Sequence, residues 1–214
     1  MSSHAAHIEV GPGDPPHIHH MDSTTAYHAA KLGMWLFLGT EILLFAVMFC
    51  GFAVMRYMHL SEFHEGSHHL NVKLGALNTV VLLISSWTAA LGVTAAQKSD
   101  NKGIVKWFGI SILCGAGFLV IKTIEYGSKY AGQMFPLQEN FHQYKNFLGF
   151  YFCMTGLHAL HVVIGMILLG WVVVKAMNNR FSERYYTPVE LGALYWHLVD
   201  LIWIYLFPLL YLVG

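Results

Sequence analysis

Five long apolar stretches, separated by polar connections, account for most of this 214-residue chain. They cover residues 30–55, 74–96, 105–125, 147–174 and 191–213. Each is long enough to cross a bilayer as a helix, which takes about 20 apolar residues. We therefore predict an all-α, polytopic membrane protein in which residues 29–214 form one bundle of five transmembrane helices. No internal repeat is evident, which argues against a transporter built from two inverted halves.

The first 28 residues have a different character, because they are polar, rich in histidine and interrupted by Gly11, Pro12, Gly13, Pro15 and Pro16. Glycine and proline at this density break helices. We predict that residues 1–28 form a flexible polar tail.

Composition agrees with a membrane protein, since 56% of the residues are hydrophobic and only 11% are charged. The formal net charge is +0, and no basic patch is evident, so nucleic acid is not expected as a partner. Positive residues near span ends favour the cytoplasmic side. Seven lie on the side of the N-terminus and five on the opposite side, which predicts a cytoplasmic N-terminus and an outer C-terminus.

Polar residues inside the last apolar stretch are the first candidates for function. His197 and Asp200 are three positions apart, so they project from the same side of a helix. An ionisable group at this depth costs about 2.5–3.5 kcal/mol on insertion scales, so it requires a partner. We expect Asp200 to pair with His197 or with a polar group on a neighbouring helix. Pro208 is expected to bend the helix near its outer end.

The first stretch contains one carboxyl, Glu41, with Phe37, Phe45 and Phe49 along the same stripe. Burial among phenyl rings disfavours the charged form, so we expect a protonated acid near the bilayer centre unless water reaches it. Two roles stay open. Glu41 either handles protons or modulates the protein, or it is a structural acid that forms a hydrogen bond to another helix.

His158 and His161 share a face of the fourth stretch with Gly165. Three interpretations are open: a metal site completed by His197, a haem held by His158 and His197, or hydrogen bonds between helices made by neutral imidazoles. We favour the last, and we expect no haem or metal in this chain. Asn78 and the small and hydroxylated residues around it in the second stretch predict close helix packing.

Two further groups of polar residues are expected to be structural or solvated. Lys122 and Glu125, at the outer end of the third stretch, predict a local ion pair whose lysine reaches toward the membrane interface. A histidine-rich tract can bind metal weakly. We nevertheless expect the histidines of the tail and connections to be solvated. They are His4, His7, His17, His19, His20, His28, His59, His64, His68, His69 and His142.

Four sequence blocks together carry a family resemblance: residues 30–41 (AKLGMWLFLGTE), 77–83 (LNTVVLL), 156–165 (GLHALHVVIG) and 195–203 (YWHLVDLIW). They resemble subunit III of the haem–copper oxidases, the cytochrome c oxidase family. Their order and spacing match the family over nearly the whole chain after the tail. The resemblance implies a five-span bacterial form in the inner membrane.

The resemblance also implies a role. Such a subunit is non-catalytic and carries no cofactor; it packs mainly against subunit I, with subunit II as a further partner, while haems and copper lie in those subunits. It sustains proton uptake, protects the complex from inactivation during turnover and holds structural phospholipids. The complex reduces oxygen to water and pumps protons in aerobic respiration, and it can associate with other respiratory complexes. Glu41 falls where the family has a carboxyl that reacts with carbodiimides.

One departure from the family pattern concerns the number of spans. Many members have seven, and the two missing here are the N-terminal pair that helps to enclose a lipid-filled cleft. Close alternatives are subunit III of a quinol oxidase and the related accessory protein of nitric oxide reductase. Two alternatives belong to a different functional class: a stand-alone haem-binding membrane protein and a small proton channel.

Overall fold

The computed structural model describes residues 23–68, 70–132, 134–135 and 144–212, so residues 1–22 of the tail predicted for residues 1–28 lie outside the described part. Its elements are α1 (Ser23–Met58), α2 (Leu60–His68), α3 (Val72–Gln97), α4 (Asn101–Ala131), α5 (Lys145–Met177), α6 (Thr187–Phe207) and the π-helix η2 (Pro208–Leu212). Five helices are long and apolar enough to cross a membrane. The prediction of an all-α protein with five spans is confirmed.

The helices extend beyond the predicted spans, most clearly at the start of the chain. α1 begins at Ser23, so residues 23–28, which were predicted to belong to the tail, are helical. The reason is tertiary, because this polar end of α1 is held against the first turn of α6. The hydroxyl of Tyr27 donates to Oε2 of Glu190 (3.1 Å), and Nζ of Lys31 lies 2.7 Å from Oε1 of the same carboxylate.

The structure contains two short helical elements, α2 and η2, that the sequence analysis did not predict. The connection 56–73 contains the nine-residue helix α2. At Pro208 the chain leaves the α-helical pattern of α6 and continues as the π-helix η2, which ends at Leu212. Proline lacks an N–H group and therefore removes one backbone hydrogen bond, which explains why the hydrogen-bonding pattern changes there.

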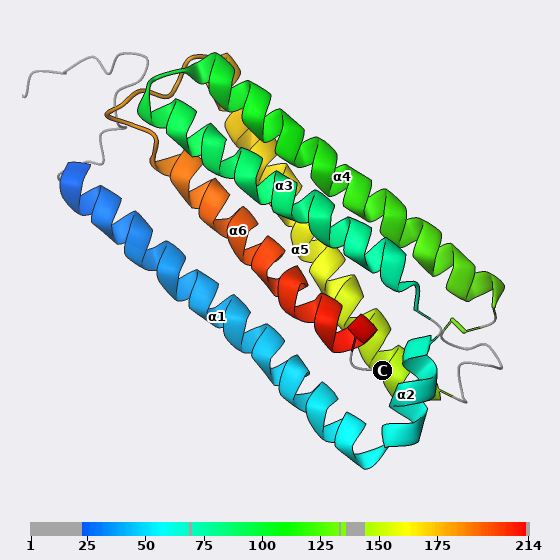
Figure 1. Cartoon of the computed structure of the whole chain (residues 1–214). Coiled ribbons are helices and arrows are strands. Elements are labelled where there is room, and N and C mark those ends of the chain that lie inside the picture. The colour runs from blue at the N-terminus through cyan, green and yellow to red at the C-terminus, as the bar shows by residue number, and fades with distance from the viewer. Residues whose placement is uncertain (1–22, 69, 133, 136–143, 213–214) are drawn as a thin grey trace, which may run out of the picture.

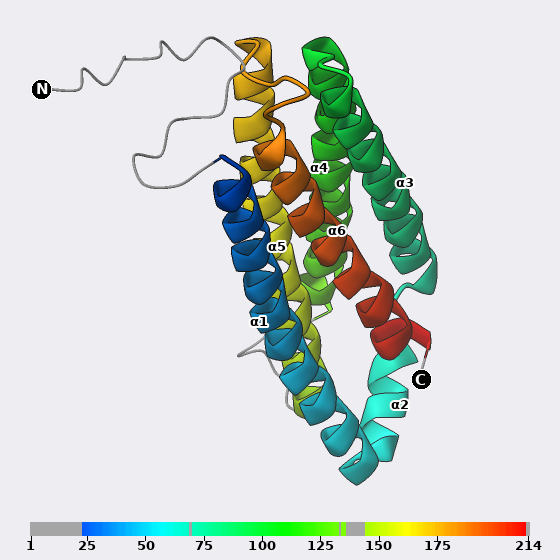
Figure 2. The same cartoon turned by 90° about the vertical axis from the view of Figure 1, so that its left-hand side faces the viewer.

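The spanning helices form one bundle in which α6 is central and α1 peripheral (Figure 1). α3 and α4 pack side by side, and α6 lies between α3 and α1 (Figure 2). In the most apolar segment of the span formed by α6 and η2, 56% of the residues are buried. In the corresponding segment of α1, only 17% are buried. α6 is therefore the element around which the other spans are arranged.

Small and hydroxylated residues bring α3 and α4 together, as the composition of the second stretch predicts. The hydroxyl of Ser85 donates to the carbonyl of Ser111 (3.3 Å), and the hydroxyl of Ser111 donates to the carbonyl of Ser85 (3.1 Å). The hydroxyls of Thr88 and Ser111 lie 2.8 Å apart. Such bonds contribute about 0.6 kcal/mol each on average within a membrane, so close packing remains the main contribution.

The indole of Trp196 joins α6 to this helix pair and to α5. Its Nε1 donates to Oγ of Ser85 (2.7 Å), and its ring lies against Gly115 of α4 and Gly165 of α5. A Cβ atom on Gly165 would lie 2.8 Å from Cε3 of Trp196, and one on Gly115 would lie 2.7 Å from Cη2. Both positions therefore require glycine because of a close approach.

We expect Gly165→Ala to lower the free energy of unfolding by about 1–3 kcal/mol, because overpacking displaces a ring that has no space to move. Gly170 is the matched control on the same helix, since a Cβ there meets no atom within 4 Å. Gly170→Ala should leave stability unchanged or raise it slightly, as alanine is the better helix former. Equal losses from both substitutions, measured by thermal unfolding in detergent, would show that Trp196 does not set the packing.

Candidate functional sites within the membrane

Glu41 of α1 and His161 of α5 form a close polar contact between the two helices. Oε2 of Glu41 lies 2.8 Å from Nε2 of His161, and the two side chains are 16% and 9% exposed. The bond connects residues that are 120 positions apart in the sequence. Because α1 is peripheral, this polar contact is a main tie between α1 and the rest of the bundle.

The second nitrogen of His161 defines how protons are distributed in this pair. Nδ1 lies 2.8 Å from the carbonyl oxygen of Leu157, and a carbonyl only accepts, so Nδ1 must carry a hydrogen. Nε2 then either accepts the proton of a neutral Glu41 or donates as part of an imidazolium–carboxylate pair. In both cases a hydrogen bond joins the two side chains.

Aromatic rings shield the Glu41–His161 pair. Phe45 is buried and meets the His161 ring edge to face, with centroids 5.3 Å apart. Phe37 stacks on Tyr195 of α6 at 6.0 Å, although its own side chain is largely exposed. The hydroxyl of Tyr195 donates to the backbone carbonyl of His161 at 3.5 Å. Phe45 of the predicted stripe therefore packs against the histidine of the pair.

His158 and His161 contact different helices despite their shared face on α5. His158 is completely buried between Phe118 of α4 and Trp203 of α6, with ring centroids 5.4 and 5.3 Å away. Neither of its ring nitrogens has a hydrogen-bond partner among the described residues. The described residues also contain no group of three or more His, Cys, Asp or Glu side chains arranged to hold a metal ion.

On α6, His197 bonds to α3. Its Nδ1 lies 2.6 Å from Oγ of Ser86, whose hydroxyl also interacts with the carboxyl of Asp200. The structure shows no hydrogen bond between His197 and Asp200, and Oδ1 of the buried Asp200 has no partner in the described part of the chain. Asn78 is completely buried on α3, and both of its amide atoms likewise lack partners there.

A buried charged cluster on α4 is the largest departure from the sequence interpretation. Nζ of Lys122 lies 3.0 Å from Oε2 of Glu125, so the predicted ion pair exists. The expectation that Lys122 reaches the membrane interface is wrong, because the two side chains are only 6% and 2% exposed. Lys122 donates to the hydroxyl of Tyr211 (2.7 Å), which in turn donates to Oε1 of Glu125 (2.6 Å).

Several aromatic groups and a second lysine complete this cluster. Lys122 lies 4.9 Å from the ring centroid of Trp203 and 3.5 Å from the hydroxyl of Tyr151. Lys129 is also buried and is attracted electrostatically by Glu125. Glu125 therefore attracts two buried lysines. The spacing of Lys122 and Glu125 reveals the pair, but nothing in the sequence points to Tyr211, which is 89 positions from Lys122.

Taken together, the fold and these interhelical polar contacts define a multi-pass α-helical membrane protein whose polar groups meet inside one bundle. The family model described as cytochrome c oxidase subunit III matches residues 17–214. The chain therefore belongs to the cytochrome c oxidase subunit III family and is a subunit of a haem–copper oxidase, an oxidoreductase complex.

Individual relatives support this assignment over most of the chain. A cytochrome c oxidase subunit 3 from Corynebacterium diphtheriae is 33% identical over 187 residues, which are 86% of this chain and 87% of the relative. A protein of the same name from Thermostichus vulcanus is 34% identical and covers 85% and 86% of the two chains. A quinol oxidase subunit 3 from Bacillus subtilis is 30% identical and covers 86% of each.

Proposed function

We propose that this chain is the non-catalytic subunit III of a proton-pumping oxidase that takes electrons from cytochrome c and reduces oxygen to water. The family match over residues 17–214 is the observation that carries the proposal. The haems and copper then lie in partner subunits, with subunit I as the main contact and subunit II as a further one. Within the bilayer this chain supplies packing and hydrogen bonds rather than ligands for a redox centre.

The proposed setting is the bacterial inner membrane, with the N-terminus in the cytoplasm and the C-terminus outside. The excess of seven positive residues over five on the N-terminal side supports this orientation. Many large apolar side chains of α1 are exposed, among them Leu36, Leu43 and Val47. They offer a surface to phospholipids and to the partner subunits, since an apolar face of this size is stable only when lipid or protein covers it.

A quinol oxidase is the second candidate, because the relative from Bacillus subtilis carries that name. Electron-donor assays on the purified complex distinguish the two candidates. Rapid oxidation of reduced cytochrome c, with little oxidation of a ubiquinol analogue, supports the proposal; the reverse preference would replace it with the quinol oxidase. Failure of the chain to copurify with haem-bearing subunits would contradict both.

In the proposed oxidase, Glu41 is a structural or modulatory carboxyl rather than an obligatory proton carrier. Its close contact with His161 supports this role, because it connects α1 to α5. A carboxyl that connects two helices can stabilise the bundle while the oxygen chemistry takes place in another subunit. The pairing itself could not be predicted from the sequence.

We expect Glu41→Gln to assemble and to consume oxygen at close to the normal rate. The amide of glutamine retains the shape of the side chain and donates to Nε2 of His161 in place of the acid. Glu41→Ala leaves Nε2 without its partner, which costs about 0.6 kcal/mol on average and up to about 1.7 in a membrane. The alanine variant should therefore hold α1 less firmly while it still supports oxygen reduction.

Steady-state oxygen consumption and proton-pumping yield of the two assembled variants measure this. His161→Ala provides the matched control, since it removes the same bond from the opposite side and should resemble Glu41→Ala. Complete loss of turnover in a fully assembled Glu41→Gln complex would make Glu41 an obligatory proton carrier.

A further inference from the structure

The short helix α2 lies at one end of the bundle, next to the start of α5 and the π-helix η2 (Figure 1). One face of it is fixed to α5. Glu62 accepts hydrogen bonds from N and Nδ2 of Asn146 (2.7 and 2.9 Å), and buried Phe63 packs edge to face on Phe52 and Phe147. At Gly66 a Cβ atom would lie 2.6 Å from Cδ1 of Phe147, so helix and ring are in close contact.

The other face of α2 presents two exposed histidines, His64 and His68, four positions apart. Their Nε2 atoms lie 3.4 Å from each other, and their ring centroids are separated by 4.8 Å. Residues at this spacing are neighbours on a helix surface. The two side chains therefore direct one nitrogen each to a common point, on an element whose opposite face is held by packing and hydrogen bonds.

The separation of these nitrogens suits one tetrahedral metal ion. Zinc binds imidazole nitrogen at about 2.0–2.1 Å, so two nitrogens at a tetrahedral angle lie about 3.3–3.4 Å apart. From this geometry we infer that His64 and His68 bind Zn²⁺ through their Nε2 atoms. Each ring then carries its remaining hydrogen on Nδ1. The site departs from the expectation that the histidines of this connection are only solvated.

The local sequence agrees with this inference. Residues 64–68 read His-Glu-Gly-Ser-His, which places two histidines on one helical face in the H-E-x-x-H arrangement that binds zinc. A hydrolase of that type needs a third protein ligand, and the described residues contain no group of three candidate ligands. We therefore assign two ligands among the described residues and propose no hydrolytic activity for this site.

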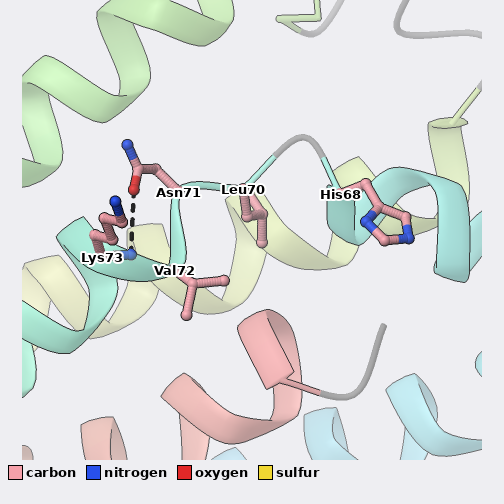
Figure 3. A pocket seen from close by; sticks show the side chains of 5 residues that line it. All are labelled: His68, Leu70, Asn71, Val72 and Lys73. Atoms are coloured by element: carbon pink, nitrogen blue, oxygen red, sulfur yellow. Dashed lines mark hydrogen bonds between the residues drawn. The ribbon is translucent and has the colours of Figure 1, made fainter.

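The surroundings leave room for a hydrated ion. His68 borders an open pocket of about 520 Å³ that is also lined by residues 70–73 (Figure 3). Oδ1 of Asn71 in that pocket accepts from N of Lys73 (3.1 Å) and N of Leu74 (3.3 Å), so it caps α3 and does not serve as a ligand. Without a metal, the two rings make at most one long, exposed hydrogen bond, which contributes little to stability.

The test is Zn²⁺ binding to the purified oxidase complex in detergent, measured by equilibrium dialysis and metal analysis. The variants are His64→Gln and His68→Gln, and the control is His59→Gln, which changes an exposed histidine of the same connection. We expect His64→Gln and His68→Gln each to bind one zinc ion fewer per chain than the unaltered protein. Removing one ligand of a chelating pair should weaken binding by about tenfold or more, because the second ligand no longer acts at high effective concentration.

A second readout separates this site from any zinc that binds elsewhere in the complex. Zn²⁺ should protect His64 and His68, but not His59, from modification by diethyl pyrocarbonate, as located by mass spectrometry. The inference is overturned if both glutamine variants retain the zinc content of the unaltered protein, if His59→Gln loses as much zinc as they do, or if the three histidines are modified alike with and without Zn²⁺. These outcomes do not depend on the electron donor, so they leave the proposed function untouched.

Discussion

Glu125→Gln is expected to lower the free energy of unfolding by about 3–5 kcal/mol, because it removes one partner from a buried ion pair. The amide keeps the shape of the side chain and can still accept the hydrogen bond from Tyr211, so the change isolates the charge. Without the carboxylate, the buried ammonium groups of Lys122 and Lys129 lose the negative charge that attracts both. Unfolding in mixed micelles, followed by loss of helicity, measures the effect.

A mutant cycle with Lys122→Met makes this prediction sharper. Replacing a whole buried pair by uncharged groups is often nearly neutral, whereas breaking it is not. The double variant should therefore lose less stability than the sum of the two single variants. Glu183→Gln is the control, since this carboxyl is exposed and its substitution should change stability by at most about 0.5 kcal/mol. The buried cluster would be contradicted if the stability losses of Glu125→Gln and Lys122→Met were strictly additive, or if Glu183→Gln lost as much stability as Glu125→Gln.

The length and apolar character of the spans were sufficient to predict the five spanning helices, because the thickness of the bilayer sets both. Their ends were less predictable. The first turns of α1 depend on Glu190, which is 163 positions from Tyr27, and no local pattern reports such a contact. α2 was not predicted because its nine residues are mostly polar; it is held by Phe63 and Glu62 against α5.

The candidate sites were also predictable only in part, because local sequence patterns do not reveal contacts between helices. Glu41, His161 and the Lys122–Glu125 pair stand out in the sequence, because polar residues are rare inside apolar stretches. Their partners follow from the arrangement of the helices. Glu41 meets His161 because α1 packs on α5, and Glu125 is buried because η2 brings Tyr211 to it from 86 positions away. Spacing along one helix predicted local pairs, whereas the contacts between helices required the fold.

The position of Trp196 shows how α6 became the central span. A large ring can lie between α4 and α5 only where both helices present glycine, at Gly115 and Gly165. The same ring reaches α3 through its bond to Ser85. One side chain therefore fixes the distances from α6 to three neighbouring helices, which is consistent with its exposure of 1%.

We expect Trp196→Ala to lower the free energy of unfolding by about 3–5 kcal/mol, since it leaves a cavity where three helices meet. Trp196→Phe should lose less, because it retains a six-membered ring in the same place. It removes the indole donor, which contributes about 0.5–1.5 kcal/mol, and the smaller volume of the pyrrole ring. The matched control is Trp87→Ala on α3, whose side chain is 63% exposed and whose loss leaves no enclosed cavity.

A combination with Gly165→Ala provides the decisive measurement. In the presence of Trp196 the added methyl group overlaps the ring, whereas in Trp196→Ala it enters the space that the ring has vacated. The alanine at position 165 should therefore be destabilising in the first background and neutral or stabilising in the second, so the two changes are strongly non-additive. Thermal unfolding of the four proteins in detergent measures this coupling. If Gly165→Ala had the same effect in both backgrounds, the ring would not be seated against Gly165, and the central role of Trp196 in the bundle would have to be abandoned.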